Sequence, residues 1–530
     1  MQNHQQSDRL SWGDTVFLHL EREGMPLNMA SICMFDGEVS FADCVQFVES
    51  KLPFIPRYLK RVVSAPFGLG LPSWEYDPEF DIRRHVLEVT IKRGTETELK
   101  TLAGKLFSEV MDRQHPLWDI TVVRGLKGNR TALIFRVHHC LADGIAGVSI
   151  MNVLLDANPQ APRLPRKKLK FRVPPPRDPL AALTTGFVES YSDFVKQILS
   201  ALTDLLSMAE RAAVNGSDVD TREFVSLIPE ITAFTERLRF NVPYKGPQKF
   251  SFTEVPLADI KAIRHKCKTS VNDVILALVT ATIRRYCELH GDRVKDKLLR
   301  IMVPVNLRGT NSPSELGNRI SLVPVTIPLD IRHPLKLLAA AHKRTEFLKR
   351  INAAGLVSLA GGLIGMFPAS IQGLIGPLAS RLPITPFNLV CTNVPGPQVP
   401  LYLLGHKMLH CYPYVPVGGE MAVNCAILTY NGMAHFGFSG DAQAAPDLRK
   451  LEKLLTESFG ELRAAAGLEP PRTGKKRIRP RRRVMPPATA KVMPTAVASP
   501  AGVSPLEPKR APEPAPAAET EVPVAELAVA

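Results

Sequence analysis

The sequence predicts an α/β fold divided into two domains. Apolar runs with the alternation typical of strands are interspersed with segments whose apolar residues recur at helical spacing, as in sheets covered by helices. The chain has 530 residues, too many for one compact hydrophobic core, so two domains and additional segments are expected. We expect each domain to contain a mixed β-sheet with flanking helices.

In the first half of the chain, strands and helices are expected in alternation. The segment 28–37 has the apolar composition of a strand and closes with an Asp36-Gly37 turn. The segment 96–111 places leucines on one helical face. The full set comprises the helices 8–24, 41–51 and 96–111 and the strands 28–37, 86–91, 120–123 and 131–137.

The second half shows the same two kinds of pattern. Ser270 is a candidate N-cap for a helix beginning at residue 271, and Asn431-Gly432 is a typical hairpin turn. The expected elements are the strands 250–255, 301–304, 389–397, 421–430 and 433–439 and the helices 257–265, 271–290 and 447–465.

The composition changes between the halves and again near the C-terminus. Residues 157–179 are rich in proline and basic side chains, which favours an extended linker before further helical segments. After about residue 466 the chain is rich in proline, alanine and valine without periodicity, which is typical of disorder. The predicted parts are an N-terminal domain (1–160), a connecting segment (161–240), a C-terminal domain (241–465) and a tail (466–530).

The formal net charge of +15 is unevenly distributed. Residues 472–483 carry eight basic residues and no acidic one, and residues 163–172 carry six basic residues. Such clusters suit anionic lipid headgroups, the phosphates of a small ligand or nucleic acid, and they are equally compatible with two solvated loops.

The sequence also bears on localisation. The N-terminus lacks the basic and apolar regions of a secretory signal, and none of the eight cysteines forms a Cys-x-x-Cys pair, so a cytoplasmic protein with free thiols is expected. Residues 351–380 are uncharged, but Pro368, Pro377 and several glycines disfavour a single membrane-spanning helix. Two short apolar helices are expected there, which would line an apolar tunnel, enter a lipid surface or form a buried core pair.

The strongest candidate site lies in residues 131–148, TALIFRVHHCLADGIAGV. This segment begins with strand alternation and ends with helical spacing, and His138 and His139 lie at the junction. A neutral imidazole can take a proton from an alcohol and return it later. Because successive strand residues point to opposite faces, we expect one histidine to face a cavity and the other to be structural.

Two other interpretations of this segment remain open. A pair of hydrogen-bonded histidines at the end of a buried strand needs no chemistry. A zinc site would use His138, His139, Cys140 and Asp143, but adjacent ligands on a strand diverge and no second Cys/His cluster has suitable spacing, so no metal site is expected. Asp143 is expected to cap the following helix or to pair with an arginine.

The segment HHCLADG (138–144) resembles the HHxxxDG signature of the acyl-CoA-dependent acyltransferase superfamily, which includes chloramphenicol acetyltransferase and peptide-synthetase condensation domains. Further motifs make the chain similar to the bacterial wax ester synthase/diacylglycerol acyltransferase family. These motifs follow the family's order and are FDIRRH (80–85), PLWD (116–119), VND (271–273), PVNLR (304–308) and NVPGP (393–397).

The resemblance implies two chloramphenicol-acetyltransferase-like domains with an active-site tunnel at their interface. His139 is then the general base, and His138 supports it. Asp143 has an orienting role, with Arg308 of the other domain as its candidate partner. Asn272, at a helix N-terminus, is the oxyanion candidate. The residues expected to contact substrate are Gly144, Asp273, Arg308, Asn393 and Pro395.

The resemblance also implies the substrates. Acyl-CoA is the donor, as a substrate and not a cofactor, and the acceptor is diacylglycerol or a long-chain alcohol. We favour diacylglycerol, and hence triacylglycerol synthesis without an acyl-enzyme.

Peripheral association with the inner membrane face or lipid inclusions is expected, and nucleic-acid binding is not. The alternatives are a non-catalytic lipid-surface binding protein and a condensation-type enzyme acting on carrier-protein thioesters.

The sequence contains no P-loop, GxSxG or GxGxxG motif. Their absence disfavours a kinase, a serine hydrolase and a dinucleotide-dependent enzyme.

Overall fold

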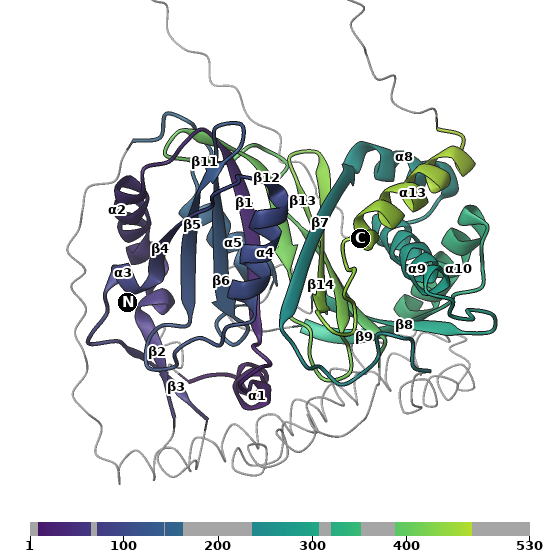
Figure 1. Cartoon of the computed structure of the whole chain (residues 1–530), viewed down its shortest axis with the longest axis horizontal. Coiled ribbons are helices and arrows are strands. Elements are labelled where there is room, and N and C mark those ends of the chain that lie inside the picture. The colour runs from purple at the N-terminus through teal and green to yellow at the C-terminus, as the bar shows by residue number, and fades with distance from the viewer. Residues whose placement is uncertain are drawn as a thin grey trace, which may run out of the picture. The chain divides into compact units, whose positions relative to one another are not determined.

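Two six-stranded mixed β-sheets and one two-stranded sheet form the framework of the protein (Figure 1). The computed structural model describes residues 9–64, 71–142, 144–162, 236–306, 320–350 and 387–468. All of these residues belong to one compact unit. The predicted α/β class with mixed sheets and flanking helices is confirmed. The linker and helices expected in 163–235, the apolar pair of 351–380 and the tail beyond residue 468 lie outside the described residues.

The first sheet combines strands from both halves of the sequence. Its strand order is β11-β12-β1-β6-β5-β4. β12, from the second half, pairs antiparallel with β1, so residues far along the chain complete the N-terminal sheet. The strands are β1 (Asn28–Asp36), β4 (Val86–Thr90), β5 (Trp118–Leu126), β6 (Arg130–His138), β11 (Tyr402–Leu403) and β12 (His406–Tyr414).

The second sheet is built from the second half alone, in the order β7-β14-β13-β10-β8-β9. β13 and β14 form the predicted hairpin, and Asn431 and Gly432 at its turn both have positive φ, 45° and 82°. The strands are β7 (Gln248–Pro256), β8 (Leu298–Asn306), β9 (Ile320–Pro328), β10 (Leu389–Pro395), β13 (Val423–Tyr430) and β14 (Met433–Asp441).

Four helices share a hydrophobic core with the second sheet, namely α8 (Leu257–Cys267), α9 (Val271–Leu289), α10 (Pro334–Arg350) and α13 (Lys450–Ala465). α9 begins as predicted, because the Ser270 hydroxyl accepts from the backbone N–H of Asp273 while the Asp273 carboxylate accepts from the backbone N–H of Ser270. This reciprocal cap fixes the start of the longest helix in the described part of the chain.

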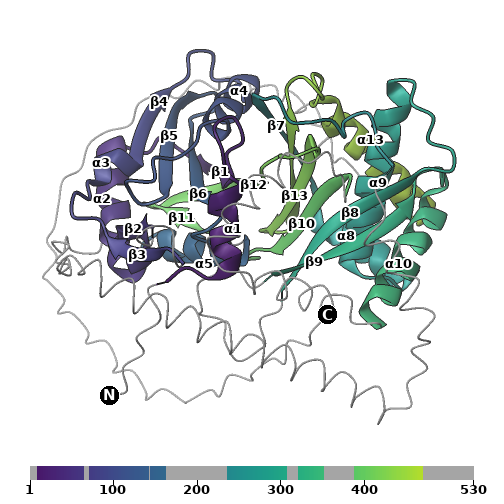
Figure 2. The same ribbon diagram turned by 90° about the horizontal axis from the view of Figure 1, so that it is seen from below.

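The other α-helices in the described part of the chain pack near the first sheet. They are α1 (Trp12–Leu20), α2 (Phe41–Lys51), α3 (Ile82–His85), α4 (Glu96–Phe107) and α5 (Gly144–Leu154), and the two-stranded sheet is β2 (Lys60–Val63) with β3 (Ser73–Tyr76). α1 lies below the first sheet in Figure 1 and faces the viewer in Figure 2.

The two faces of the first sheet pack against different parts of the protein. Ile32 and Ile134 belong to a core shared with α4 and β7. Cys33 and Leu133, their neighbours along β1 and β6, belong instead to a core shared with α2 and α5. The sheet is therefore covered on both sides, and the period-two alternation of each strand determines which side a residue faces.

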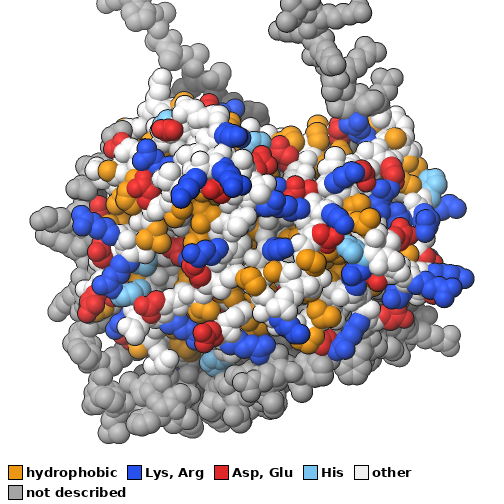
Figure 3. Space-filling model, in the orientation of Figure 1, with side chains coloured by type: hydrophobic (Ala, Val, Ile, Leu, Met, Phe, Trp, Pro, Cys, Tyr) orange, Lys and Arg blue, Asp and Glu red, His pale blue; other side chains and the backbone are white. Residues whose placement is uncertain are grey.

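The surface drawn in Figure 3 carries Lys and Arg side chains interspersed with Asp and Glu. Among the described helices, none combines the length and apolarity that a transmembrane span needs. The two basic clusters, 163–172 and 472–483, lie outside the described residues.

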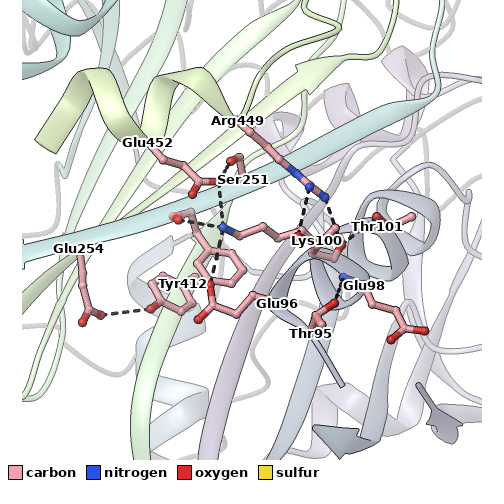
Figure 4. Close-up of polar contacts among 12 residues, drawn as sticks. Thr95, Glu96, Glu98, Lys100, Thr101, Ser251, Glu254, Tyr412, Arg449 and Glu452 are labelled. Atoms are coloured by element: carbon pink, nitrogen blue, oxygen red, sulfur yellow. Dashed lines mark hydrogen bonds and ion pairs between the residues drawn. The ribbon is translucent and has the colours of Figure 1, made fainter. Parts of the chain in front are cut away.

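Lys100 on α4 joins the two halves of the chain (Figure 4). Its ammonium donates to Oε1 of Glu452 on α13 at 2.8 Å and to the carbonyl oxygen of Phe252 on β7 at 3.3 Å. It also lies 4.1 Å from the centroid of the Phe252 ring. Because the Lys100 side chain is only 7% exposed, these partners replace most of its hydration.

We predict that Lys100→Ala lowers the free energy of unfolding by about 2–3 kcal/mol. Removing one partner of a buried ion pair leaves the other uncompensated, but Glu452 stays partly hydrated, which reduces the loss. Urea denaturation of the full chain measures the effect. The control is Lys453→Ala, whose 82% exposed side chain pairs with Glu457 at 3.6 Å. That variant should change stability by less than about 0.5 kcal/mol, and equal losses in the two variants would contradict the structural role of Lys100.

Candidate active site

A cavity with a volume of about 400 Å³ lies between the first sheet and strands β8, β10 and β13 of the second. Its size is that of a small-molecule site. β1, β6 and β12 of the first sheet, together with α2 and α5, supply much of its wall, which is predominantly apolar. His139, Thr392 and Asn393 are among the few polar side chains that line it. A cavity of this kind suits a ligand with long hydrocarbon chains and one reactive polar centre.

Because side chains alternate between the two faces along β6, His139, directly after the end of this strand, faces the cavity. Every second residue from the middle of the strand lines the cavity, namely Leu133, Phe135, Val137 and His139. Arg136 and His138, on the other face, are buried elsewhere, and the guanidinium of Arg136 donates two hydrogen bonds to the carboxylate of Asp119. The expected separation of the two histidines is therefore present in the structure.

The His139 ring is held in place from two directions. The ring of Phe17, on α1, stacks on it with the centroids 3.8 Å apart and the planes at 11°. The backbone N–H of His139 donates to the carbonyl oxygen of Leu27 at 3.0 Å. With the backbone and one ring face fixed, the half-buried imidazole is oriented before any substrate arrives.

His138 is fully buried and makes structural contacts. Its Nδ1 accepts a hydrogen bond from the backbone N–H of Cys140 at 3.1 Å, which places the ring proton on Nε2. Nε2 lies 3.4 Å from Oε1 of Glu21, just beyond α1. Glu21 also accepts from the backbone N–H of Leu27 and from the Arg113 guanidinium. Leu27 thus connects the two histidines, since its carbonyl binds the His139 N–H.

The charge of Glu21 stabilises this arrangement. Burial disfavours ionisation of its carboxyl group, but His138, the Leu27 N–H and Arg113 outweigh burial and hold the pKa of Glu21 below its ordinary value. Glu21 is therefore ionised at neutral pH and anchors the segment that precedes β1 beside the end of β6.

Three of the residues expected to contact substrate lie at the cavity with His139. Gly144, the first residue of α5, faces Val394 so closely that a Cβ would come within 2.9 Å of that side chain. Asn393 and Pro395, on β10, line the opposite wall. Oδ1 of Asn393 is buried and makes no hydrogen bond within the described residues. A substrate hydroxyl or amide in the cavity would supply the partner it lacks.

Asn272 and Asp273 lie in the first turn of α9, as the sequence predicts. Neither belongs to the described lining of the cavity. The Asp273 carboxylate, 1% exposed, accepts from the Ser270 N–H, His342 Nδ1 and the Thr345 hydroxyl, so it fixes α9 to α10 in place of contacting substrate. Burial opposes its ionisation, but these hydrogen bonds hold its pKa below the ordinary value. The oxyanion role of Asn272 stays a prediction.

The expected pairing of Asp143 with Arg308 lies outside the described residues. In contrast, Phe17 and Glu21 contact the two histidines and were not expected to do so. Phe17 lies on α1, and Glu21 directly follows the end of that helix. No feature of the sequence connects that helix with residues 138–139, because the contact spans more than a hundred positions.

Two family models match the chain. The wax ester synthase/diacylglycerol acyltransferase catalytic domain matches residues 10–275, and the C-terminal domain of the same family matches residues 316–463. Among curated relatives, the probable diacylglycerol O-acyltransferase tgs1 of Mycobacterium tuberculosis is 29% identical over 419 residues, covering 77% of this chain and 84% of the relative. The probable diacylglycerol O-acyltransferase tgs2 of that species is 25% identical, covering 87% and 100%.

Solved structures show the same fold. The wax ester synthase/diacylglycerol acyltransferase of Marinobacter aquaeolei VT8 matches with a TM-score of 0.59 and 23% identity, covering 87% of this chain and all of that one. The first condensation domain of the calcium-dependent antibiotic synthetase matches with a TM-score of 0.55 and 14% identity, covering 87% and 97%. At these identities the likeness concerns architecture.

We predict that Glu21→Gln lowers the free energy of unfolding by about 1–3 kcal/mol at pH 7, because a charge that faces His138 and Arg113 is removed. The pKa of Glu21 is lower in the folded chain than in the unfolded one. Its stabilisation is thus present above the ordinary glutamate pKa and is lost as the pH falls through the folded value.

The difference between wild type and Glu21→Gln should accordingly shrink in denaturation experiments at progressively lower pH. Glu23→Gln, on an exposed neighbour, is the control and should have little effect at any pH. A difference for Glu21→Gln that stays constant with pH would show that its carboxylate is not held in the ionised form.

Proposed function

The chain belongs to the wax ester synthase/diacylglycerol acyltransferase family, and we propose that it transfers a long-chain acyl group from acyl-CoA to the hydroxyl of diacylglycerol, forming triacylglycerol. The observation that carries this proposal is the position of His139 on the wall of a predominantly apolar cavity. The relatives named as diacylglycerol O-acyltransferases support the choice of acceptor. Wax ester formation from long-chain alcohols is a second activity, supported by the family's description.

In the proposed reaction, His139 takes the proton from the acceptor hydroxyl as its oxygen attacks the thioester carbonyl. The tetrahedral intermediate collapses, the C–S bond breaks, and the coenzyme A thiolate receives the proton from His139. No acyl-enzyme forms. The neighbouring Cys140 is fully buried, and burial raises the pKa of its thiol well above the ordinary value, so it is unsuited to act as a nucleophile.

The negative charge on the intermediate needs hydrogen-bond donors. Asn393 is the amide best placed for this work among the described residues, because it lines the same cavity as His139. Its Nδ2 would donate to the thioester oxygen while its buried Oδ1 accepts from a substrate hydroxyl. Asn272 remains the candidate proposed from the resemblance, and Asp143, Gly144 and Pro395 would shape the segments around the reacting groups.

The walls of the cavity support a long-chain substrate. The residues that surround His139 from β1, β6 and α5 are almost all apolar, so acyl chains would displace water there and the reacting groups would meet in a medium of low polarity. A condensation domain has a similar fold, but the family match favours acyl-CoA over a carrier-protein thioester as donor.

We also propose that the protein associates peripherally with a lipid surface, since its acceptor partitions into lipid. The basic clusters at 163–172 and 472–483 would contact anionic headgroups there. This attraction would weaken as the salt concentration rises.

We predict that His139→Ala lowers the esterification rate by about 10²–10⁴-fold, since a general base contributes on that order. The assay incubates purified protein with labelled palmitoyl-CoA and either diolein or hexadecanol, followed by lipid separation. His333→Ala, at an exposed position before α10, is the matched control and should keep full activity. Near-wild-type esterification by a folded His139→Ala variant would refute the proposed mechanism.

A second prediction concerns chain length. Gly147 on α5 lines the cavity, and a Cβ added there would meet no atom within 4 Å, so a larger side chain would occupy space intended for substrate. Gly147→Leu should lower kcat/KM for palmitoyl-CoA relative to octanoyl-CoA by about tenfold or more. Gly460→Leu, at an exposed helical glycine on α13 that also has open space, should leave that ratio unchanged. If wild type, Gly147→Leu and Gly460→Leu all show the same ratio, the acyl chain does not bind beside Gly147.

A further inference from the structure

A cluster of two histidines and one carboxylate joins the two sheets, away from the cavity. We propose that Glu254, His410 and His435 form a binding site for a divalent transition metal ion of the zinc type. The three residues come from three strands, β7, β12 and β14. Glu254 and His435 are cross-strand partners in the second sheet, whereas His410 belongs to the strand that completes the first sheet. A bound ion would therefore tie one sheet to the other.

The positions of the ligand atoms suit such an ion. Nδ1 of His410 lies 2.8 Å and Nε2 of His435 lies 3.2 Å from Oε2 of Glu254. All three ligand atoms lie within 4.8 Å of one another. Zinc bonds of about 2.0–2.2 Å in a tetrahedron place ligand atoms about 3.3–3.5 Å apart, so only small side-chain shifts are required. Two imidazoles and one carboxylate leave a fourth position for water.

His435 supplies an independent reason to expect a ligand. Its side chain is fully buried, and neither ring nitrogen makes a hydrogen bond within the described part of the chain. A buried polar group without a partner is costly and uncommon in folded proteins. Nε2 of His435 is nevertheless directed at the carboxylate of Glu254. An ion placed between them would bind Nε2 and the carboxylate together.

The surroundings would support coordination and allow entry. The Tyr412 hydroxyl donates to Oε2 of Glu254 at 3.2 Å, which orients the carboxylate (Figure 4). The side chains of His410 and Glu254 are 28% and 25% exposed, so an ion can reach them from solvent. Cys411 and Pro413, the alternate residues of β12, line the cavity. The metal site thus lies across β12 from His139.

The test uses the full-length protein after chelator treatment and dialysis, titrated with ZnCl₂ by calorimetry and by thermal denaturation. We expect one Zn²⁺ per chain and a rise in Tm on binding. His410→Ala and Glu254→Gln each remove one ligand at a partly exposed position, and each should weaken Zn²⁺ affinity at least about tenfold and reduce the Zn²⁺-dependent rise in Tm. His265→Ala, at an exposed position on α8, is the matched control and should bind as the wild type does.

Co²⁺ provides a direct view of the ligands, because its visible absorption depends on which groups coordinate it. The wild-type spectrum should change in His410→Ala and be unaffected in His265→Ala. The proposal is overturned if the wild type binds no Zn²⁺. It is equally overturned if folded His410→Ala and Glu254→Gln bind Zn²⁺ with wild-type affinity. These readouts do not depend on esterification, so they test the metal site independently of the proposed function.

Discussion

The candidate active site depends on the antiparallel pairing of β6 with β1. Their register runs without a break from Asp36 opposite Arg130 to Asn28 opposite His138. This register decides which face each residue of β6 occupies, and a slip of one position would exchange the two histidines between the cavity and the buried contact with Glu21. The Phe17 stack and the Leu27 carbonyl then fix the ring of His139. The pairing of β6 with β1 thus determines which of the two histidines faces the cavity.

The cavity itself requires both halves of the sequence. β6 and α5 supply one wall with His139 and Gly144, while β10 supplies Asn393 on the other. β12 belongs to the second half of the sequence but pairs into the first sheet, and its Cys411 also lines the cavity. Contacts such as the buried ion pair of Lys100 hold the halves together at a distance from the chemistry. An isolated half would therefore lack part of the cavity.

Local signals predicted much of this structure. The helix that begins at Ser270 and the Asn431-Gly432 hairpin follow from capping and turn chemistry, and the alternation of β6 predicted that the two histidines diverge. Local signals could not predict contacts between residues that lie far apart in the sequence. Nothing near β12 indicates that it pairs with β1, and nothing near Phe17 indicates that it stacks on His139. Asp273 was expected at the substrate from the family resemblance, whereas in the structure it completes the capping box of α9.

The most direct test of the account is a crystal structure of the protein with a non-hydrolysable thioether analogue of palmitoyl-CoA. The account predicts that the acyl chain occupies the cavity between β6 and β10. The carbon attached to sulfur should lie beside the His139 ring, with room for an acceptor hydroxyl within hydrogen-bond distance of a ring nitrogen. An acyl chain bound outside this cavity, or a His139 ring sealed from the thioether by packed side chains, would contradict it.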